Sequence, residues 1–224
     1  MYWRLEPARR GMRFSRIEIT QILIAVAAMT LAFSLVFLGR IYWLSSVPAV
    51  FDLVVIALIF VSSFVAVVTA FLLHELAHKA VAQRYGCFAE FRAYPMGLLL
   101  GIFTAAFGFL FAAPGAVMVS GAVSERQNAR ISAAGPGTNA ILAAGFIGLA
   151  VLLGVSPDPI ENIAAFFVGD IAFVNLFLGG FNLVPFPPLD GSKIFAYDRV
   201  MWVAMVVGLV AVGYLGWTLG VVRF

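Results

Sequence analysis

The chain is too apolar to fold as a water-soluble globule. Hydrophobic residues make up 63% of its 224 residues and charged residues only 11%, whereas a soluble domain carries about 25% charged residues. So few charges do not cover a water-facing surface, and lipid must therefore serve as the solvent of this fold. At about 20 residues per spanning helix, roughly six helices with short loops fill the length. This predicts one integral membrane domain over residues 1–224, in contact with the lipid bilayer, and no separate soluble domain.

Long apolar runs divide the chain into candidate membrane-spanning helices. Each of five runs is long enough to cross a bilayer as a helix, and they cover residues 17–38, 49–73, 131–155, 163–184 and 201–222. The chain contains no internal repeat and no low-complexity tract. The pattern predicts an all-α polytopic membrane protein with about five to six transmembrane helices plus a membrane-embedded hairpin or strand segment.

The hairpin is predicted from a sixth apolar stretch, residues 96–113, which is shorter and precedes a strand-like segment at 116–121. If this stretch crosses the bilayer fully, Lys and Arg divide nine inside to five outside. If it dips in and returns with the strand, the division is twelve to two. The positive-inside rule favours the returning hairpin. Non-helical backbone at membrane depth has to be covered by protein or by a water-filled cavity, so such a hairpin is expected to line a site.

Basic residues near the start of the chain predict its orientation. Five of the 14 Lys and Arg residues lie within the first 16 residues, which predicts a cytoplasmic N-terminus rather than a nucleic-acid-binding arm, so no nucleic-acid partner is expected. The basic segment and the apolar run that follows it are both too long for a cleaved signal peptide. The chain is therefore expected to be a multi-pass protein of the cell membrane.

Both histidines of the chain lie in one short motif, His74-Glu75-Leu76-Ala77-His78. On a helix the two imidazoles stand one turn apart on the same face, where both can bind a single Zn²⁺, and the adjacent carboxylate can reach a metal-bound water as general base. The alternative is a helix end with interfacial histidines. It is less favoured because ionisable residues in a membrane segment are costly and usually functional.

A catalytic zinc takes three protein ligands and keeps one open position. Cys87 is the single cysteine and no third histidine exists, so the third ligand must be a carboxylate. Asp190 follows three prolines and precedes Gly191, a pattern that ends a helix and lets a carboxylate project from non-helical backbone. Asp170 has no such surroundings and is expected to pair with an Asn or a hydroxyl inside the bundle. The returning hairpin also puts Asp190 on the same side of the membrane as the histidines.

The remaining polar residues of the apolar runs have either a catalytic role or a role in helix packing. Asn139 ends the segment AGPGTN at 134–139, where it could stabilise an oxyanion or hold a substrate carbonyl, or make a hydrogen bond between packed helices. The glycines and the proline of this segment let helices approach closely or break one locally. Asn175 and Asn182 are expected to be packing residues.

Three segments together resemble the site-2 protease family of intramembrane zinc metalloproteases. They are HELAH at 74–78, AGPGTN at 134–139 and NLVPFPPLDG at 182–191, in this order and each on or beside an apolar run. The resemblance implies a catalytic core at about 50–192 and one Zn²⁺ per chain. It implies hydrolysis of peptide bonds within or near transmembrane segments of membrane-protein substrates, as in regulated intramembrane proteolysis. The site residues that it implies are the ligands His74, His78 and Asp190, the general base Glu75, and Asn139 as a further catalytic residue.

The expected reaction is peptide-bond hydrolysis with water admitted from the cytoplasmic side, near the charged residues Lys79 and Arg84. Glu75 would take a proton from the zinc-bound water and return it to the leaving amine, and Asn139 would share the oxyanion with the zinc. A substrate helix must unwind before it is attacked. An unwound segment could pair with the strand edge formed by Ala116, Val117, Met118 and Val119.

Other classes of function compete with this prediction. A non-enzymatic transporter or ion-binding carrier would use the two histidines and Asp170 as a midplane cation site, but it would be favoured by inverted repeats, which the sequence lacks. A silent relative that only binds partners would not need Glu75 beside its ligands. Another class of membrane zinc protease is disfavoured by the proline-rich segment before Asp190. The prediction is therefore a zinc metalloendopeptidase, with no particular oligomeric state.

Overall fold

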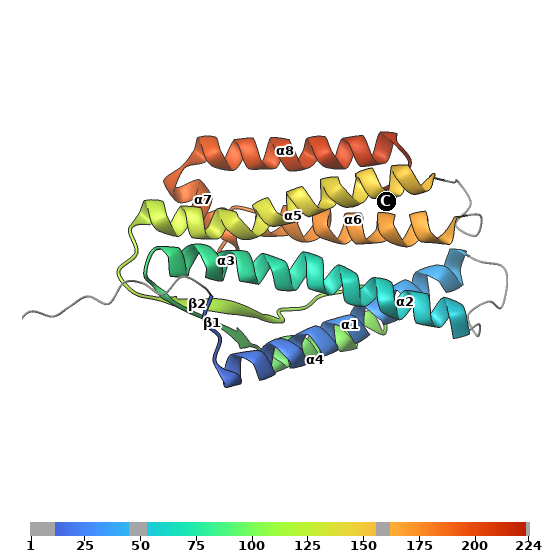
Figure 1. The fold of residues 1–224 in the computed structure, drawn as a ribbon, viewed down its shortest axis with the longest axis horizontal. Helices are drawn as coiled ribbons and strands as arrows, with labels where there is room; N and C mark the ends of the chain where they lie inside the picture. The colour runs from blue at the N-terminus through green and yellow to red at the C-terminus, as the bar shows by residue number, and fades with distance from the viewer. Residues whose placement is uncertain (1–11, 45–52, 156–161, 223–224) are drawn as a thin grey trace, which may run out of the picture.

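The computed structural model describes residues 12–44, 53–155 and 162–222, and helices dominate them (Figure 1). The elements follow one another as α1 (Arg16–Leu44), α2 (Leu53–Ala66), the π-helix η2 (Val67–Leu72), α3 (Leu73–Arg84), β1 (Phe88–Ala93), α4 (Pro95–Ala105), β2 (Gly115–Ser120), α5 (Glu125–Leu153), α6 (Ile163–Asn182), α7 (Asp190–Tyr197) and α8 (Arg199–Thr218).

Within the described residues, five helical segments are long and apolar enough to cross a membrane, which confirms the predicted class of fold. They are Arg16–Gly39, Leu53–Arg84, Glu125–Leu153, Ile163–Asn182 and Arg199–Thr218. The second segment joins α2, η2 and α3 and continues past the apolar run, so the HELAH motif lies within a helix rather than at its end. The first residues of the run predicted at 49–73 lie outside the described residues.

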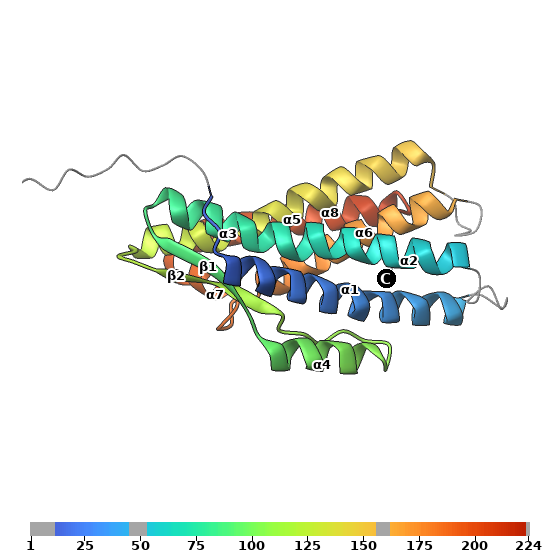
Figure 2. The same cartoon turned by 60° about the horizontal axis from the view of Figure 1, so that its bottom comes forward.

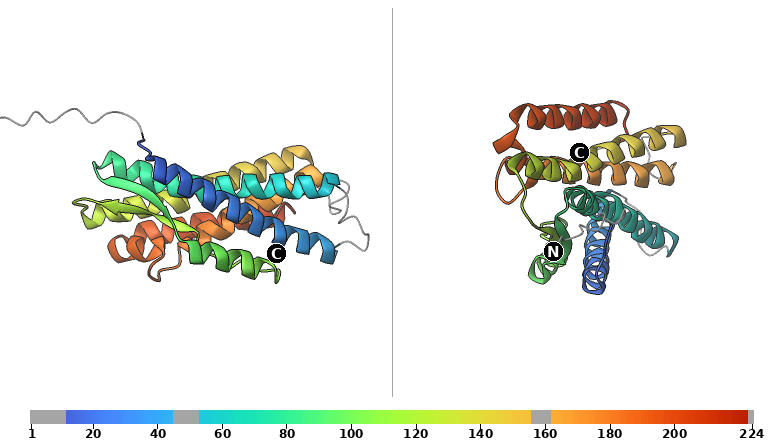
Figure 3. Two further views of the ribbon diagram at one scale, coloured as in Figure 1. Left: turned by 90° about the horizontal axis from the view of Figure 1, so that it is seen from below. Right: turned by 60° about the vertical axis from the view of Figure 1, so that its left-hand side comes forward.

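The long helices pack side by side, with α5 and α6 between α8 on one side and the α1–α3 group on the other (Figure 1, Figure 3). Apolar side chains of α5, α6 and α8 form one core, around Ala143, Ile147 and Leu176. A second core joins α1 and η2 to β1 and α4, around Met29, Phe71 and Phe91. Both strands and α7 lie toward the same end of the bundle.

The stretch at 96–113 turns back on itself, as the predicted hairpin requires. Helix α4 begins with Pro95 at its first turn, a position that suits proline, and ends after 11 residues. The chain then turns back along it as an extended segment that leads into β2, and α4 lies against α1 on the outside of the bundle (Figure 2). This return needs small residues, because a Cβ at Gly97 or Gly101 would collide with Ala113 or Ala112.

The two strands pair antiparallel, with Phe88 opposite Ser120 and Ala93 opposite Gly115. β2 agrees with the predicted strand, whereas β1 was not predicted. Side chains of α1 and α3 bind the outer edge of β1: Glu18 and Gln21 accept from the Phe91 and Ala93 amides at 2.9 Å each, and Gln83 donates to the Ala89 carbonyl at 3.3 Å. The backbone N–H and C=O groups of these odd-numbered residues therefore point away from β2. Opposite residues of an antiparallel pair direct their backbone groups either both inward or both outward, so the backbone groups of Val117 and Val119 point away from β1.

A fully buried ion pair fixes this sheet to the bundle. Lys79 Nζ lies 2.6 Å from each carboxylate oxygen of Glu18, and neither side chain is exposed. Glu18 also accepts from the Phe91 amide, so one carboxylate joins α1, α3 and β1. Lys79 was expected to lie near water, but it is paired in the interior, since a buried charge needs a partner.

Candidate metal centre

Helix α3 brings the two histidines together. His74 and His78 are 2% and 7% exposed, and their rings lie one turn apart with centroids 4.6 Å from each other. Their Nε2 atoms are 3.0 Å apart. Each Nδ1 is turned away from this point, toward Asn139 Oδ1 for His74 and toward the Ile131 carbonyl, at 2.6 Å, for His78. Both rings therefore offer the same atom, Nε2, to one location.

Asp190 completes the cluster from a distant part of the chain. Its Oδ2 lies 3.3 Å from His74 Nε2 and 3.0 Å from His78 Nε2. The segment 183–189 between α6 and α7 is not α-helical, as the prolines predict, but Asp190 itself is the first residue of α7.

Two glycines let the backbone pack closely around the cluster, because neither has a Cβ. A Cβ on Gly135 of α5 would lie 2.6 Å from His74 Nε2 and still closer to His78 Nε2. A Cβ on Gly191 would overlap the backbone of Leu183 and Val184. Neither glycine has a positive φ, so Gly191 serves packing rather than the turn that its position suggested. Helix α5 continues through Pro136, so the AGPGTN segment allows close packing and does not break the helix.

The donor set suits zinc. Among the described residues, His74, His78 and Asp190 are the three whose ligand atoms all lie within 4.8 Å of one another. Two imidazole nitrogens and one carboxylate oxygen, with a fourth position open, form a ligand set typical of a catalytic zinc. Gly135 leaves the space beside both Nε2 atoms free of a side chain. Asp170, on α6, is buried and lies outside this cluster, so the cation site required of a carrier is not assembled.

Glu75 lies between the metal cluster and the sheet. It belongs to α3, beside His74, and its Oε2 accepts from the amide of Val117 at 2.9 Å. Val117 is thus the residue of β2 that the structure brings into contact with Glu75. The backbone groups of Ala116 and Met118 point the other way, toward β1, whereas those of Val119 point outward like those of Val117.

Asn139 lies behind His74 rather than beside the open metal position. It is fully buried, and its Nδ2 donates to the Ala70 carbonyl at 2.9 Å and to Asn175 Oδ1 at 3.2 Å. Both of its N–H donors are engaged, so the oxyanion contact expected of Asn139 is not the one that the structure shows. Asn182 donates to the carbonyl of Leu178 in its own helix at 3.0 Å.

Sequence reasoning did not identify Glu18 as important for the site. The available signal was an acidic residue inside the first apolar run, because a carboxylate at such a position requires a partner. Lys79, next to His78, was the partner, but pairing across 61 residues is visible only in three dimensions. The pair holds α3 and β1 to α1 and so fixes the helix that carries both histidines.

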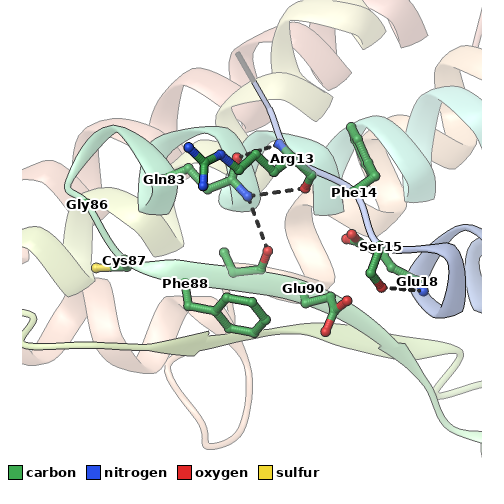
Figure 4. A pocket seen from close by; sticks show the side chains of 10 residues that line it. Arg13, Phe14, Ser15, Glu18, Gln83, Gly86, Cys87, Phe88 and Glu90 are labelled. Carbon is green, nitrogen blue, oxygen red and sulfur yellow. Dashed lines mark hydrogen bonds between the residues drawn. The ribbon is translucent and has the colours of Figure 1, made fainter. Parts of the chain in front are cut away.

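A separate cavity of about 530 Å³ lies where the segment before α1 crosses the end of α3 (Figure 4). Gln83 spans it, accepting from the Arg13 amide at 3.2 Å and donating to the Ala89 carbonyl. Glu18 contributes to its wall, while the residues of the metal cluster do not. The cavity is therefore not part of the metal centre.

Comparisons with known proteins agree with this centre. The chain is 37% identical over 206 residues to the Methanocaldococcus jannaschii protein named "Putative zinc metalloprotease MJ0611", a match that covers 91% of this chain and 95% of the relative. It is 34% identical to YwhC of Bacillus subtilis, whose name carries the same description, over 58% of this chain and 65% of that protein. A third relative, "Zinc metalloprotease MJ0392" of Methanocaldococcus jannaschii, is 36% identical over 62% of this chain and 33% of its own length.

No family model and no solved structure matches the chain. The match to the first relative nevertheless covers nearly the whole of both proteins, and all three relatives are named zinc metalloproteases. These names imply Zn²⁺ as the cofactor, and the cluster of His74, His78 and Asp190 could hold such an ion. On these grounds the chain belongs to the site-2 protease family of zinc metalloproteases.

Proposed function

We propose that this protein is an intramembrane protease that hydrolyses peptide bonds within or near transmembrane segments of membrane proteins. The observation that carries the proposal is the place of the zinc ligands, which lie in or beside helices able to cross a membrane. The site therefore faces a substrate that shares the bilayer. Its proposed catalytic core extends over about residues 50–192, from the helix that carries the histidines to Asp190.

The roles of the residues follow from their placement. When bound by His74, His78 and Asp190, zinc supplies a Lewis acid that polarises a carbonyl and makes water more acidic. Glu75 is the general base: its carboxylate takes a proton from the attacking water and delivers it to the leaving amine. Its contact with the Val117 amide, at 2.9 Å, holds the carboxylate at the edge of β2.

The segment 116–119 of β2 is the proposed substrate site, and the backbone groups of Val117 and Val119 form its outer edge. Side chains of α1 and α3 bind the outer edge of β1, whereas the outer edge of β2 runs past Glu75. A helix hides its amides in its own hydrogen bonds, so a substrate must unwind before it is cut. An unwound segment that pairs with β2 would satisfy its backbone and lie beside the base.

The proposed orientation has the N-terminus and the zinc site near the cytoplasmic face. It is supported by the count of Lys and Arg, twelve on the cytoplasmic side and two on the other. This count requires the segment 96–113 to turn back. The short α4 and the extended segment behind it have that form. Of the five N-terminal basic residues, Arg4, Arg9 and Arg10 lie outside the described residues.

Removal of zinc should abolish proteolysis reversibly. We expect metal analysis of the purified full chain to find one zinc per chain, and a panel of single-span substrates in liposomes to be cut inside the span, as located by mass spectrometry. Chelation should stop cleavage, and stoichiometric Zn²⁺ should restore it, because the donor set holds one ion. Zinc-loaded protein that leaves every substrate intact, or cleavage that persists in metal-free protein, would refute the proposal.

Proline at position 119 should weaken substrate pairing. Val119→Pro removes an N–H from the outer edge of β2 and leaves the even-numbered residues that pair with β1. We expect kcat/KM to fall roughly tenfold, the equivalent of about one hydrogen bond, with zinc content unchanged. Val119→Ala shortens the side chain but keeps the N–H, and it serves as the control. Equal rates for the two variants would mean that substrate does not pair at this edge.

A further inference from the structure

A line of buried polar side chains extends from His74 away from the metal position and into the apolar interior. Asn139 and Asn175 are both fully buried, and Asn139 Oδ1 contacts His74 Nδ1. Asn139 Nδ2 then reaches Asn175 Oδ1 at 3.2 Å, and Asn175 Nδ2 reaches Thr69 Oγ1 at 3.1 Å. The line begins in α3, passes through α5 and α6, and returns to the π-helix η2, which directly precedes α3 in the chain.

Backbone carbonyls fix the direction of every hydrogen bond in this line, because a carbonyl can only accept. The Ile171 carbonyl, 3.0 Å from Asn175, requires the amide nitrogen of Asn175 at that position and turns its oxygen toward Asn139. The Ala70 carbonyl, 2.9 Å from Asn139, requires the amide nitrogen of Asn139 in the same way. The oxygen of Asn139 therefore faces His74, and Nδ1 of His74 must carry the proton.

A proton on Nδ1 leaves the lone pair of His74 on Nε2, the atom that lies 3.3 Å from Asp190 Oδ2. His78 is held in the same tautomer by a different group, because its Nδ1 donates to the Ile131 carbonyl at 2.6 Å. Each zinc-ligating ring thus has its own acceptor behind it, an arrangement that orients metal-ligating histidines in general.

We propose that Asn139 is a positioning residue that holds His74 in the Nδ1–H tautomer with Nε2 aimed at the metal, and that Asn175 and Ala70 set the direction of its amide. The widened turn of η2 takes part, since Ala70 lies within it. Leu73 N–H bonds back to Val68, five residues earlier, instead of to Thr69. The inference rests on the zinc site of the proposed function, and it assigns Asn139 a role through His74 in place of contact with the oxyanion.

The rival explanation is that Asn139 only packs α5 against its neighbours, and a pair of variants separates the two. Asn139→Asp keeps an oxygen toward His74 but buries a carboxylate and loses both donated bonds. Asn139→Leu fills a similar volume and accepts nothing. If Asn139 positions His74, Asp should retain zinc better than Leu; if it only packs, Leu should be the milder change, because a buried charge without donors is costly.

Zinc affinity is measured by chelator competition on the full chain in detergent. We expect Asn139→Leu to bind zinc about 10- to 100-fold more weakly than wild type, the usual effect of losing the group behind a ligating histidine. Asn139→Asp should bind zinc more weakly than wild type but more tightly than Asn139→Leu. Asn128→Ala, at an exposed position of the same helix, is the matched control and should bind as wild type does. Wild-type affinity in Asn139→Leu, or weaker binding in Asn139→Asp than in Asn139→Leu, would overturn the proposal.

Nitrogen NMR tests the tautomer directly and needs no variant. The chain has two histidines, so protein labelled with ¹⁵N-histidine shows four ring nitrogens. In the zinc-loaded wild type, both rings should ligate through Nε2 and keep a slowly exchanging Nδ1–H. In Asn139→Leu, that proton should exchange faster in His74 and be unchanged in His78, which donates to Ile131. Ligation of His74 through Nδ1, or unchanged exchange in the variant, would refute the assignment. Neither measurement involves proteolysis, so a protein that holds zinc in this way but cuts nothing would refute only the proposed function.

Discussion

Glu75→Gln is expected to keep zinc and to lose proteolysis. Glutamine has the same shape as glutamate and can still accept from the Val117 amide, but it cannot take a proton from water at neutral pH. A general base contributes about 10²- to 10⁴-fold to such a reaction, so the rate of substrate cleavage should fall by that factor. Neither ring of His74 or His78 and no oxygen of Asp190 is altered, so one zinc per chain should remain.

The measurement combines metal analysis with a cleavage assay on the same preparation. Glu125→Gln is the matched control, because Glu125 is an exposed residue in the first turn of α5 and lies outside the site. It should cut substrate at the wild-type rate. If Glu75→Gln were as active as this control, Glu75 would not be the base, and another group would have to accept the proton.

Gly135→Ala is expected to abolish stoichiometric zinc binding. The added methyl would lie 2.6 Å from His74 Nε2 and closer still to His78 Nε2, so it would occupy the position next to the ligand atoms. Both rings would have to move, although Asn139 and the Ile131 carbonyl hold them from behind. We expect zinc affinity to fall by more than about 100-fold, beyond the range typical of changes behind a ligand, and proteolysis to fall with it.

Gly137→Ala is the control on the same helix. Its methyl would meet no atom within 4 Å, and both substitutions replace glycine by a better helix former. Zinc affinity by chelator competition and thermal unfolding followed by circular dichroism distinguish the effects. Gly135→Ala should lose zinc while it retains helical content, and Gly137→Ala should retain both. Normal zinc binding by Gly135→Ala would mean that α5 does not lie against the two imidazoles.

Much of the site could be predicted because its key residues lie close together in the sequence, at a spacing that indicates their chemistry. His74 and His78 are four residues apart, so any helix places them on one face, and the shortage of other ligands left a carboxylate as the third. The spans followed from apolar length alone. The return of residues 96–113 followed from the charge count and is the form that α4 and β2 take.

Other features could not be predicted because they join residues that are distant in the chain. β1 has no strong alternation of its own, and it is ordered by β2 and by the carboxylate of Glu18. Lys79 looked like a marker of the water-facing side until its partner was known. The direction of the Asn139 amide depends on Ala70 and Asn175, 69 and 36 residues away.

Composition and helical periodicity are local properties, so the amino-acid sequence alone indicates the solvent of this protein, its helical class and the residue types that could hold a metal. Which groups those residues contact depends on how the helices pack. That packing placed Asp190 against the two histidines, brought Val117 to Glu75 and turned Asn139 toward His74 instead of toward the open metal position. In a bundle with so few polar groups, each buried donor must find an acceptor, and only the packing of the helices determines which one it meets.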